Sequence, residues 1–116
     1  MSEQIILNTG LILLIIHELD AIRCKEWRII PGLSLLSDKT GQLVFILAHI
    51  PILYGLFQQL THEIFQIGFN VFLIVHLILH LIYTRHRNNL FTHWFSWFII
   101  SGASICGLLY IMLKWN

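Results

Sequence analysis

Four long apolar segments alternate with shorter polar connections along the chain, and this pattern decides the fold class. Each segment approaches the roughly 20 residues that a helix needs to cross the ~30 Å hydrocarbon core of a bilayer. The pattern predicts transmembrane helices over residues 5–22, 42–60, 66–84 and 91–113. We therefore expect an all-α, four-helix transmembrane bundle that runs up, down, up and down, as a single integral membrane domain over residues 1–116.

The longest connection, residues 23–41, has a mixed character. It begins with charged residues, becomes apolar around Pro31 and Gly32, and ends with polar residues. Because apolar stretches with charged flanks settle at the membrane surface, we expect an interfacial segment between the first two helices, with Trp27 at headgroup level. Pro31-Gly32 interrupts any helix there.

Composition supports lipid as the solvent of this chain, since 57% of its residues are hydrophobic and only 11% are charged. The net charge is +1, and the seven Lys and Arg residues form no basic face, so we expect no nucleic-acid partner. Cys24 and Cys106 are predicted to lie near opposite faces of the membrane and therefore to stay unpaired.

The basic residues predict the orientation of the chain. Lys114 stands alone near the C-terminus, and the other six are in the first and third connections: Arg23, Lys25, Arg28, Lys39, Arg85 and Arg87. The positive-inside rule then places these two connections in the cytoplasm and both termini outside it. We expect a multi-pass protein of the bacterial inner (cytoplasmic) membrane.

Ionisable residues interrupt the first apolar segment near its cytoplasmic end. His17, Glu18 and Asp20 fall within four positions. A charge at bilayer depth costs at least ~2.5–3.5 kcal/mol, so these side chains need partners inside the protein.

Three more histidines fall at a similar depth. His49 lies two residues before the helix-kinking Pro51, and His76 and His80 share one helix face because they are four residues apart. At 1.5 Å per residue, these histidines and His17 lie within about 12 Å of the cytoplasmic ends of their helices. Small residues gather in the outer half, which predicts a bundle that is tight there and splayed around an imidazole-lined pocket at the cytoplasmic side.

Metal binding is the sharpest interpretation of these residues. Imidazoles and carboxylates together are suitable ligands for zinc, iron or manganese, and the residue types alone do not indicate which of these metals binds. Glu18 is a candidate catalytic residue, either orienting a ligand or acting as general base on a metal-bound water, and His93 is a peripheral member. The predicted metal ligands are His17, Asp20, His49, His76 and His80.

The same cluster resembles a known signature. Residues 17–21, His-Glu-Leu-Asp-Ala, resemble the His-x-x-Glu-Glu motif of small, largely uncharacterised bacterial membrane proteins, with Asp20 at the first Glu position and Ala21 at the second. More loosely, histidines spread over several spans are similar to those of His-box membrane hydroxylases and desaturases, although this chain has a single His-x-x-x-His pair. These resemblances imply an intramembrane metal site.

Several functions remain open from the residues alone. An enzyme with this site would take a membrane-lipid-like substrate that enters laterally, with metal-assisted hydrolysis or oxidation as the reaction. A haem b electron-transfer subunit would use His49 with His76, or His17 with His80, as axial ligands. A structural or accessory subunit would use its polar residues to hold helices together.

Two further expectations concern packing. Asp20 has an alternative partner in Arg23, three residues on, with which it would pair at the interface and form no site. A homo-oligomer would form through the small-residue face between Ser101 and Gly107.

Overall fold

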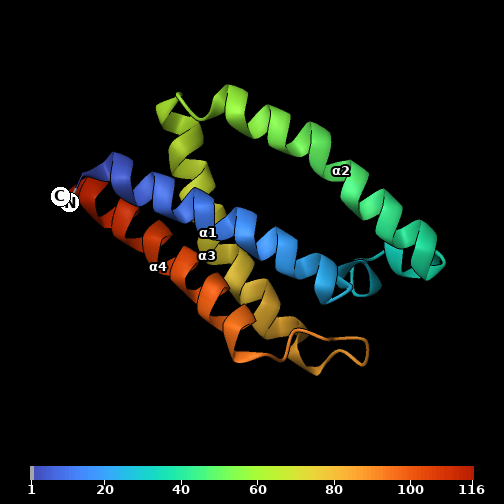
Figure 1. Cartoon of the computed structure of the whole chain (residues 1–116). Helices are drawn as coiled ribbons and strands as arrows, with labels where there is room; N and C mark the ends of the chain where they lie inside the picture. Colours follow the sequence, from blue (N-terminus) through green and yellow to red (C-terminus); the bar gives the residue numbers. More distant parts are fainter. Residues whose placement is uncertain (1) are drawn as a thin grey trace.

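The computed structural model describes residues 2–116, and among these it contains helices and turns but no strand. The four long helices are α1 (Glu3–Arg23), α2 (Asp38–Gln59), α3 (Glu63–Ile82) and α4 (Trp94–Trp115) (Figure 1). The short 3₁₀ turns are η1 (Glu26–Arg28), η2 (Leu33–Leu35) and η3 (Tyr83–Arg85). The all-α, four-helix prediction is confirmed.

Serine side chains begin two of the helices. Ser2 Oγ accepts a hydrogen bond from the Ile5 backbone N–H at the start of α1, and Ser37 Oγ accepts one from the Thr40 N–H at the start of α2. Such caps partner backbone donors that the first helical turn leaves free.

The helices alternate in direction, so the connections gather at two ends of the molecule. The loop end carries residues 24–37 and 83–93, and both chain termini lie at the opposite, terminal end (Figure 1). All four long helices are long and apolar enough to cross a membrane, which identifies a multi-pass membrane protein.

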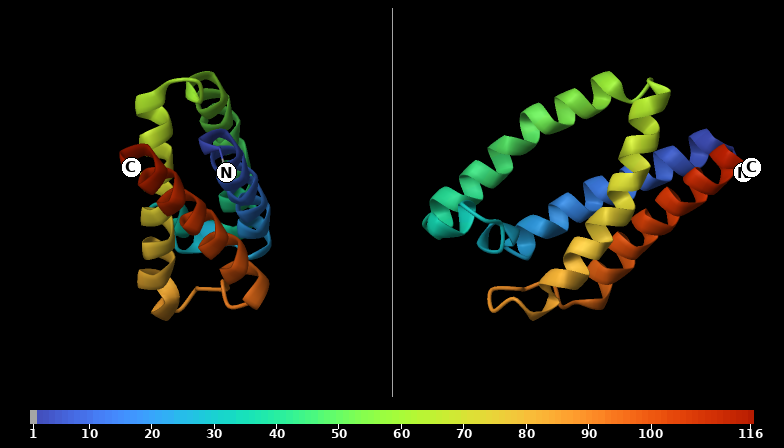
Figure 2. Two further views of the ribbon diagram at one scale, coloured as in Figure 1. Left: turned by 90° about the vertical axis from the view of Figure 1, so that its left-hand side faces the viewer. Right: turned by 180° about the vertical axis from the view of Figure 1, so that it is seen from behind.

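Three of the helices form a packed core in which α1 and α3 both run along α4 (Figure 2). A Cβ at Gly107 would lie 2.5 Å from the backbone oxygen of Asn70, so the close approach of α3 and α4 requires glycine there. Ala103 and Ser104 are also buried in this packing. Small residues of the 101–107 segment thus serve contacts within the chain.

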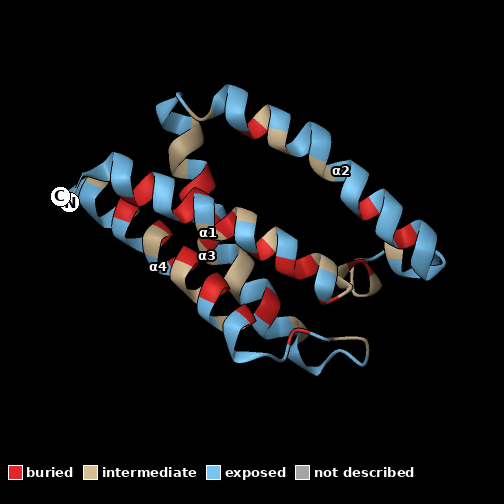
Figure 3. Ribbon diagram, viewed as in Figure 1, coloured by how far each residue is buried: buried red, intermediate tan, exposed pale blue. Residues whose placement is uncertain are grey.

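The remaining helix, α2, stands apart from this core. Most of its residues are exposed, as Figure 3 shows. Leu56 packs into the core cluster near the terminal end, and Phe45 packs with Ala21 and Trp27 near the loop end. The structure therefore separates one whole helix from the other three, which differs from the predicted splay at one leaflet.

Trp27 is packed inside the protein, and its expected depth at headgroup level stays a prediction. Its ring is 3% exposed and lies against Gly41, where a Cβ would come within 2.7 Å of Trp27 Cδ1. The absence of a side chain at Gly41 lets the indole pack beside the first turn of α2. The interfacial segment is consequently anchored to the start of that helix.

Candidate metal centre

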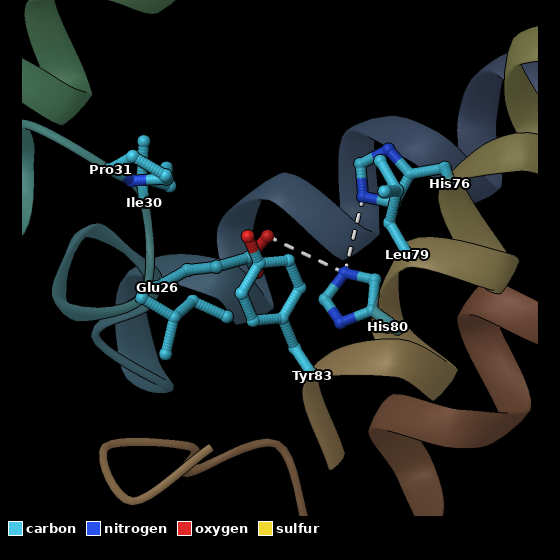
Figure 4. A pocket seen from close by; sticks show the side chains of 8 residues that line it. Glu26, Ile30, Pro31, His76, Leu79, His80 and Tyr83 are labelled. Atoms are coloured by element: carbon cyan, nitrogen blue, oxygen red, sulfur yellow. Dashed lines mark hydrogen bonds and ion pairs between the residues drawn. The ribbon is translucent and has the colours of Figure 1, made fainter. Parts of the chain in front are cut away.

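Four side chains converge at the loop-end half of the core. His17 comes from α1, Glu26 from η1, and His76 and His80 from α3. Each residue offers one ligand atom, and these four atoms lie within 4.8 Å of one another. Figure 4 shows three of these side chains, with Glu26, His76 and His80 turned toward a common point. We call these four residues the metal cluster.

The spacing of the four ligand atoms matches the first shell of a small cation. His17 Nε2 is 3.0 Å from His76 Nε2, which is 3.2 Å from His80 Nε2. Glu26 places Oε1 at 3.4 Å from His80 Nε2 and Oε2 at 3.9 Å from His17 Nε2. Ligands bound tetrahedrally at about 2.0–2.1 Å from zinc are about 3.3 Å apart, so a short adjustment would complete the shell.

Hydrogen bonds within the protein do not give every polar atom of the metal cluster a partner. A neutral imidazole carries one proton, so His76 Nε2 is either a single donor or a single acceptor toward two neighbouring Nε2 atoms. Among the described residues, His17 Nδ1, His76 Nδ1 and Glu26 Oε2 are buried without a hydrogen-bond partner. A cation between the three Nε2 lone pairs and the carboxylate would remove the repulsion among them.

Helix geometry places the three histidines. His76 and His80 lie one above the other on α3 because four residues make slightly more than one helical turn. His17 projects from the last third of α1 and is fully buried, and its ring contacts both partner rings edge-on at 4.8 and 4.9 Å between centroids.

Glu26 reaches the cluster because the chain turns back after α1. Lys25 has a left-handed backbone with φ of 50°, and η1 follows directly. A continued helix would carry Glu26 about 13 Å beyond His17, whereas the turn returns its carboxylate to the level of that ring.

The η1 turn is itself held by the start of α2. The Trp27 indole N–H donates to Asp38 Oδ1 at 3.1 Å, and Arg28 Nε donates to the same oxygen at 2.8 Å. Arg28 forms a second bond to Asp38 through Nη2. These contacts hold the two residues that directly follow Glu26.

The charge state of Glu26 suits a ligand. Burial raises the pKa of its carboxyl, but the contact with His80 and the charges of the neighbouring imidazoles outweigh burial and hold the pKa below its ordinary value. Glu26 is therefore ionised near neutral pH.

Asp20, a predicted ligand, lies in a separate cluster on α1 and α4, in which Asp20 and Ser96 are buried and the Arg23 side chain is 55% exposed. Arg23 Nε donates to Asp20 Oδ1 at 2.8 Å, Ser96 Oγ donates to Asp20 Oδ2, and Arg23 Nη2 donates to Ser96 Oγ at 3.0 Å. The structure thus has the alternative pairing with Arg23. We call Asp20, Arg23 and Ser96 the Asp20 cluster.

His49 and Glu18 are brought to one another instead of to the metal cluster. His49 Nε2 lies 2.7 Å from Glu18 Oε2, and His49 Nδ1 lies 2.7 Å from the backbone oxygen of Phe45. Because that oxygen only accepts, Nδ1 carries a proton, and the Nε2–Oε2 contact shares a second one. We call Glu18 and His49 the acid–base pair.

The peripheral candidates are remote from the ligand atoms. His93 is exposed at the start of α4, where its Nδ1 accepts a hydrogen bond from the Phe95 N–H. Cys24 and Cys106 are unpaired among the described residues, as predicted, and burial raises the pKa of the Cys24 thiol.

Cavities reach the metal cluster from two sides. One, of about 240 Å³, lies toward the loop end and is lined by Glu26, His76, His80, Pro31 and Tyr83, among others (Figure 4). Another, of about 350 Å³, lies between α2 and the core, and its walls include Glu18, His49, Glu26 and His76. The acid–base pair and the metal cluster therefore face the same space.

Glu26 is the member of the cluster that sequence reasoning missed. It follows the first apolar segment in a charged connection, where a solvated role is the ordinary expectation. Its position in the sequence could have indicated this role, because Glu26 is the one acidic residue between Asp20 and Asp38 and precedes an apolar stretch.

Fold and site together define a multi-pass helical membrane protein with a buried to half-buried His and Glu group that could hold a metal ion. The chain belongs to a family described as "Family of unknown function (DUF6713)", whose model matches residues 3–116. Comparisons with curated proteins and with solved structures give no match. The resemblance to the His-x-x-Glu-Glu type stays a prediction.

Proposed function

We propose that this protein binds one divalent transition-metal ion through His17, His76, His80 and Glu26. The observation that carries the proposal is the convergence of three imidazole Nε2 atoms on a carboxylate whose Oε2 is buried without a hydrogen-bond partner among the described residues. Zinc, iron and manganese all accept such nitrogen and oxygen ligands. The basic residues at the loop end favour a cytoplasm-facing site, with both termini outside the cytoplasm.

We further propose that the site is catalytic and acts on a membrane-lipid-like substrate. A metal ion held here would polarise a substrate oxygen or activate a water molecule, which suits hydrolysis or oxidation. The acid–base pair borders the same cavity and shares a proton between Glu18 and His49, so it supplies a proton acceptor and donor.

Haem b is the weaker alternative on this geometry. The His17 and His80 rings have centroids 4.9 Å apart, which leaves no room for a macrocycle between them. For the other pair, His49 already directs one nitrogen to Glu18 and the other to Phe45. A small ion needs neither the space of a macrocycle nor a rearrangement of His49.

Metal analysis tests the proposal. The protein is purified in lipid nanodiscs, exposed in turn to zinc, iron and manganese, washed, and measured by mass spectrometry for metal per chain. We expect about one ion per chain, loss of that ion in His76→Ala, and an absorption spectrum without a haem band.

His93→Ala is the matched control, since it removes an exposed imidazole at the start of α4 and leaves the cluster intact. We expect this variant to retain its metal. A wild-type protein that takes up none of the three ions, or one that shows a haem band, overturns the proposal.

A further inference from the structure

A second cavity continues the one that reaches the metal cluster. This chain cavity, of about 720 Å³, lies between α2 and α3 toward the terminal end of the molecule. It shares four wall residues with the cavity beside the metal cluster, namely Leu14, Ile52, Leu56 and Phe72. The two cavities are therefore neighbours that meet at these four side chains, and together they extend from the terminal end to Glu26 and His76.

The walls of the chain cavity are apolar, and Gln59 is the one polar side chain among the described residues that line it. Gly55 of α2 and Gly68 of α3 also line it. A Cβ at either glycine would meet no described atom within 4 Å, so neither glycine serves a close helix contact. These glycines instead widen the space between the two helices.

The length of the space suits one hydrocarbon chain. From Ile64 to His76, α3 rises through twelve residues, or about 18 Å at 1.5 Å per residue. One leaflet contributes about half of the ~30 Å hydrocarbon core, and its lipid chains span that half. A single hydrocarbon chain therefore has about the length of the space, and it would run from the level of His76 toward the terminal end.

The volume is small for a helix as the occupant. Along α3 the chain cavity extends from Ile64 to Phe72, or about 12 Å, and a helical segment of that length and about 10 Å wide needs about 940 Å³. The chain cavity has about 720 Å³. A transmembrane helix from a second copy of this protein therefore does not fit without displacing α2.

We propose that the chain cavity holds the single hydrocarbon chain of a membrane amphiphile, with its polar head between the metal cluster and the acid–base pair. The part concerning the head depends on the proposed function. The opposite ends of the joined cavities differ as this occupant requires, with apolar residues and two glycines at one end and Glu18, His49, Glu26 and His76 at the other. The chain enters sideways from the lipid between α2 and α3.

Photo-cross-linking tests this proposal. The probe is palmitic hydroxamic acid with a diazirine at the far end of its chain, because a hydroxamate binds divalent metals. It is added to metal-loaded protein in nanodiscs, irradiated, and located by mass spectrometry of peptides. We expect saturable labelling of the α2 and α3 walls that an excess of unlabelled palmitic hydroxamic acid removes and acetohydroxamic acid does not.

Two variants fill the chain cavity, Gly55→Leu and Gly68→Leu. Each is expected to lower the saturable labelling at least about tenfold, or about 1.4 kcal/mol, while metal content stays at the wild-type value and reports an intact fold. Val71→Phe is the matched control, since it adds bulk to an exposed position of α3 that lines none of the cavities described above. It is expected to leave the labelling unchanged.

The outcomes separate the two proposals. Metal binding with labelling that is unsaturable, or unchanged by both leucine variants, overturns the chain site and leaves the metal site standing. Wild-type protein without metal overturns the proposed function, and the chain site is then judged by repeating the experiment with diazirine-bearing palmitic acid.

Discussion

The metal cluster and the Asp20 cluster both use a side chain from the last two turns of α1, yet they treat buried polar atoms differently. In the Asp20 cluster, a carboxylate meets a guanidinium and a hydroxyl, and each group has its partner. In the metal cluster, three rings crowd their Nε2 atoms together while two Nδ1 atoms remain without a partner among the described residues.

This difference separates a structural role from a binding role. Buried polar groups in proteins are nearly always hydrogen-bonded, so a satisfied set such as the Asp20 cluster needs no further partner. In the metal cluster the three Nε2 atoms cannot all partner one another, and Glu26 Oε2 has no hydrogen-bond partner among the described residues, as expected where a cation could bind. Burial and charge alone do not make this distinction, because His17 and Asp20 are both buried.

The largest expected effect is on metal affinity and compares two residues of α1, one from each cluster. His17→Ala removes one of three imidazoles and should weaken metal binding at least about 100-fold, or about 2.7 kcal/mol. Asp20→Asn, three residues away, should change metal affinity less than about threefold, because Asp20 faces Arg23 and Ser96. Competition with a metal-binding dye measures both. Equal losses in the two variants would contradict the assignment of separate roles.

The next effect concerns the ligand from η1. Glu26→Gln keeps the size of the side chain but removes its charge, so it should weaken metal binding about 10–100-fold. Glu63→Gln is the control, since Glu63 lies at the terminal end beside Lys114. The dye competition is repeated with both variants. Unchanged affinity in Glu26→Gln would show that three imidazoles suffice without this carboxylate.

A third change acts on the Asp20 cluster alone. Ser96→Ala removes a buried hydroxyl that contacts both Asp20 and Arg23, and should lower the free energy of unfolding by about 1–3 kcal/mol. Denaturant unfolding in detergent measures this. Ser101→Ala, on the same helix and half-buried, should cost less than about 0.5 kcal/mol. Loss of metal in Ser96→Ala would mean that the two clusters are coupled.

The smallest effect reaches the metal cluster indirectly. In Gly41→Ala the new Cβ would come within 2.7 Å of Trp27, so η1 must shift and carry Glu26 with it. We expect metal binding to weaken about 3–10-fold, or about 0.7–1.4 kcal/mol. Gly55→Ala adds the same atom where no described atom lies within 4 Å and should have no effect on affinity. Identical affinities in the two variants would show that the Trp27 contact does not position Glu26.

The fold could be predicted because apolar length is a property of the linear chain. Each expected span has its helix, and the largest difference at an end is four residues, with Gln42 expected and Asp38 found for α2. The pairing of His76 and His80 could likewise be predicted from the sequence, since their spacing along one helix places them on a common face. To predict that these rings meet His17, it was enough that the three histidines lie at a similar depth in the membrane.

The remaining site residues depended on information that hydropathy does not contain. Asp20 turns toward Ser96 because α1 packs on α4, and His49 stays outside the metal cluster because α2 stands apart from the core. Glu26 depends on the left-handed conformation of Lys25, which is rare for a residue other than glycine. Which helices pack against one another, and where the chain turns back at Lys25, are both properties of the folded structure.

The distribution of the four ligands along the chain has a consequence for biosynthesis. His17 and Glu26 leave the ribosome early, whereas His76 and His80 follow only after α2 has been made. If the proposed ion is shared by all four, it is acquired late, once the first 80 of 116 residues have been translated and α3 has entered the bilayer. Nascent chains that stop before α3 would carry half a coordination sphere, so metal loading would report that membrane insertion has passed the third helix.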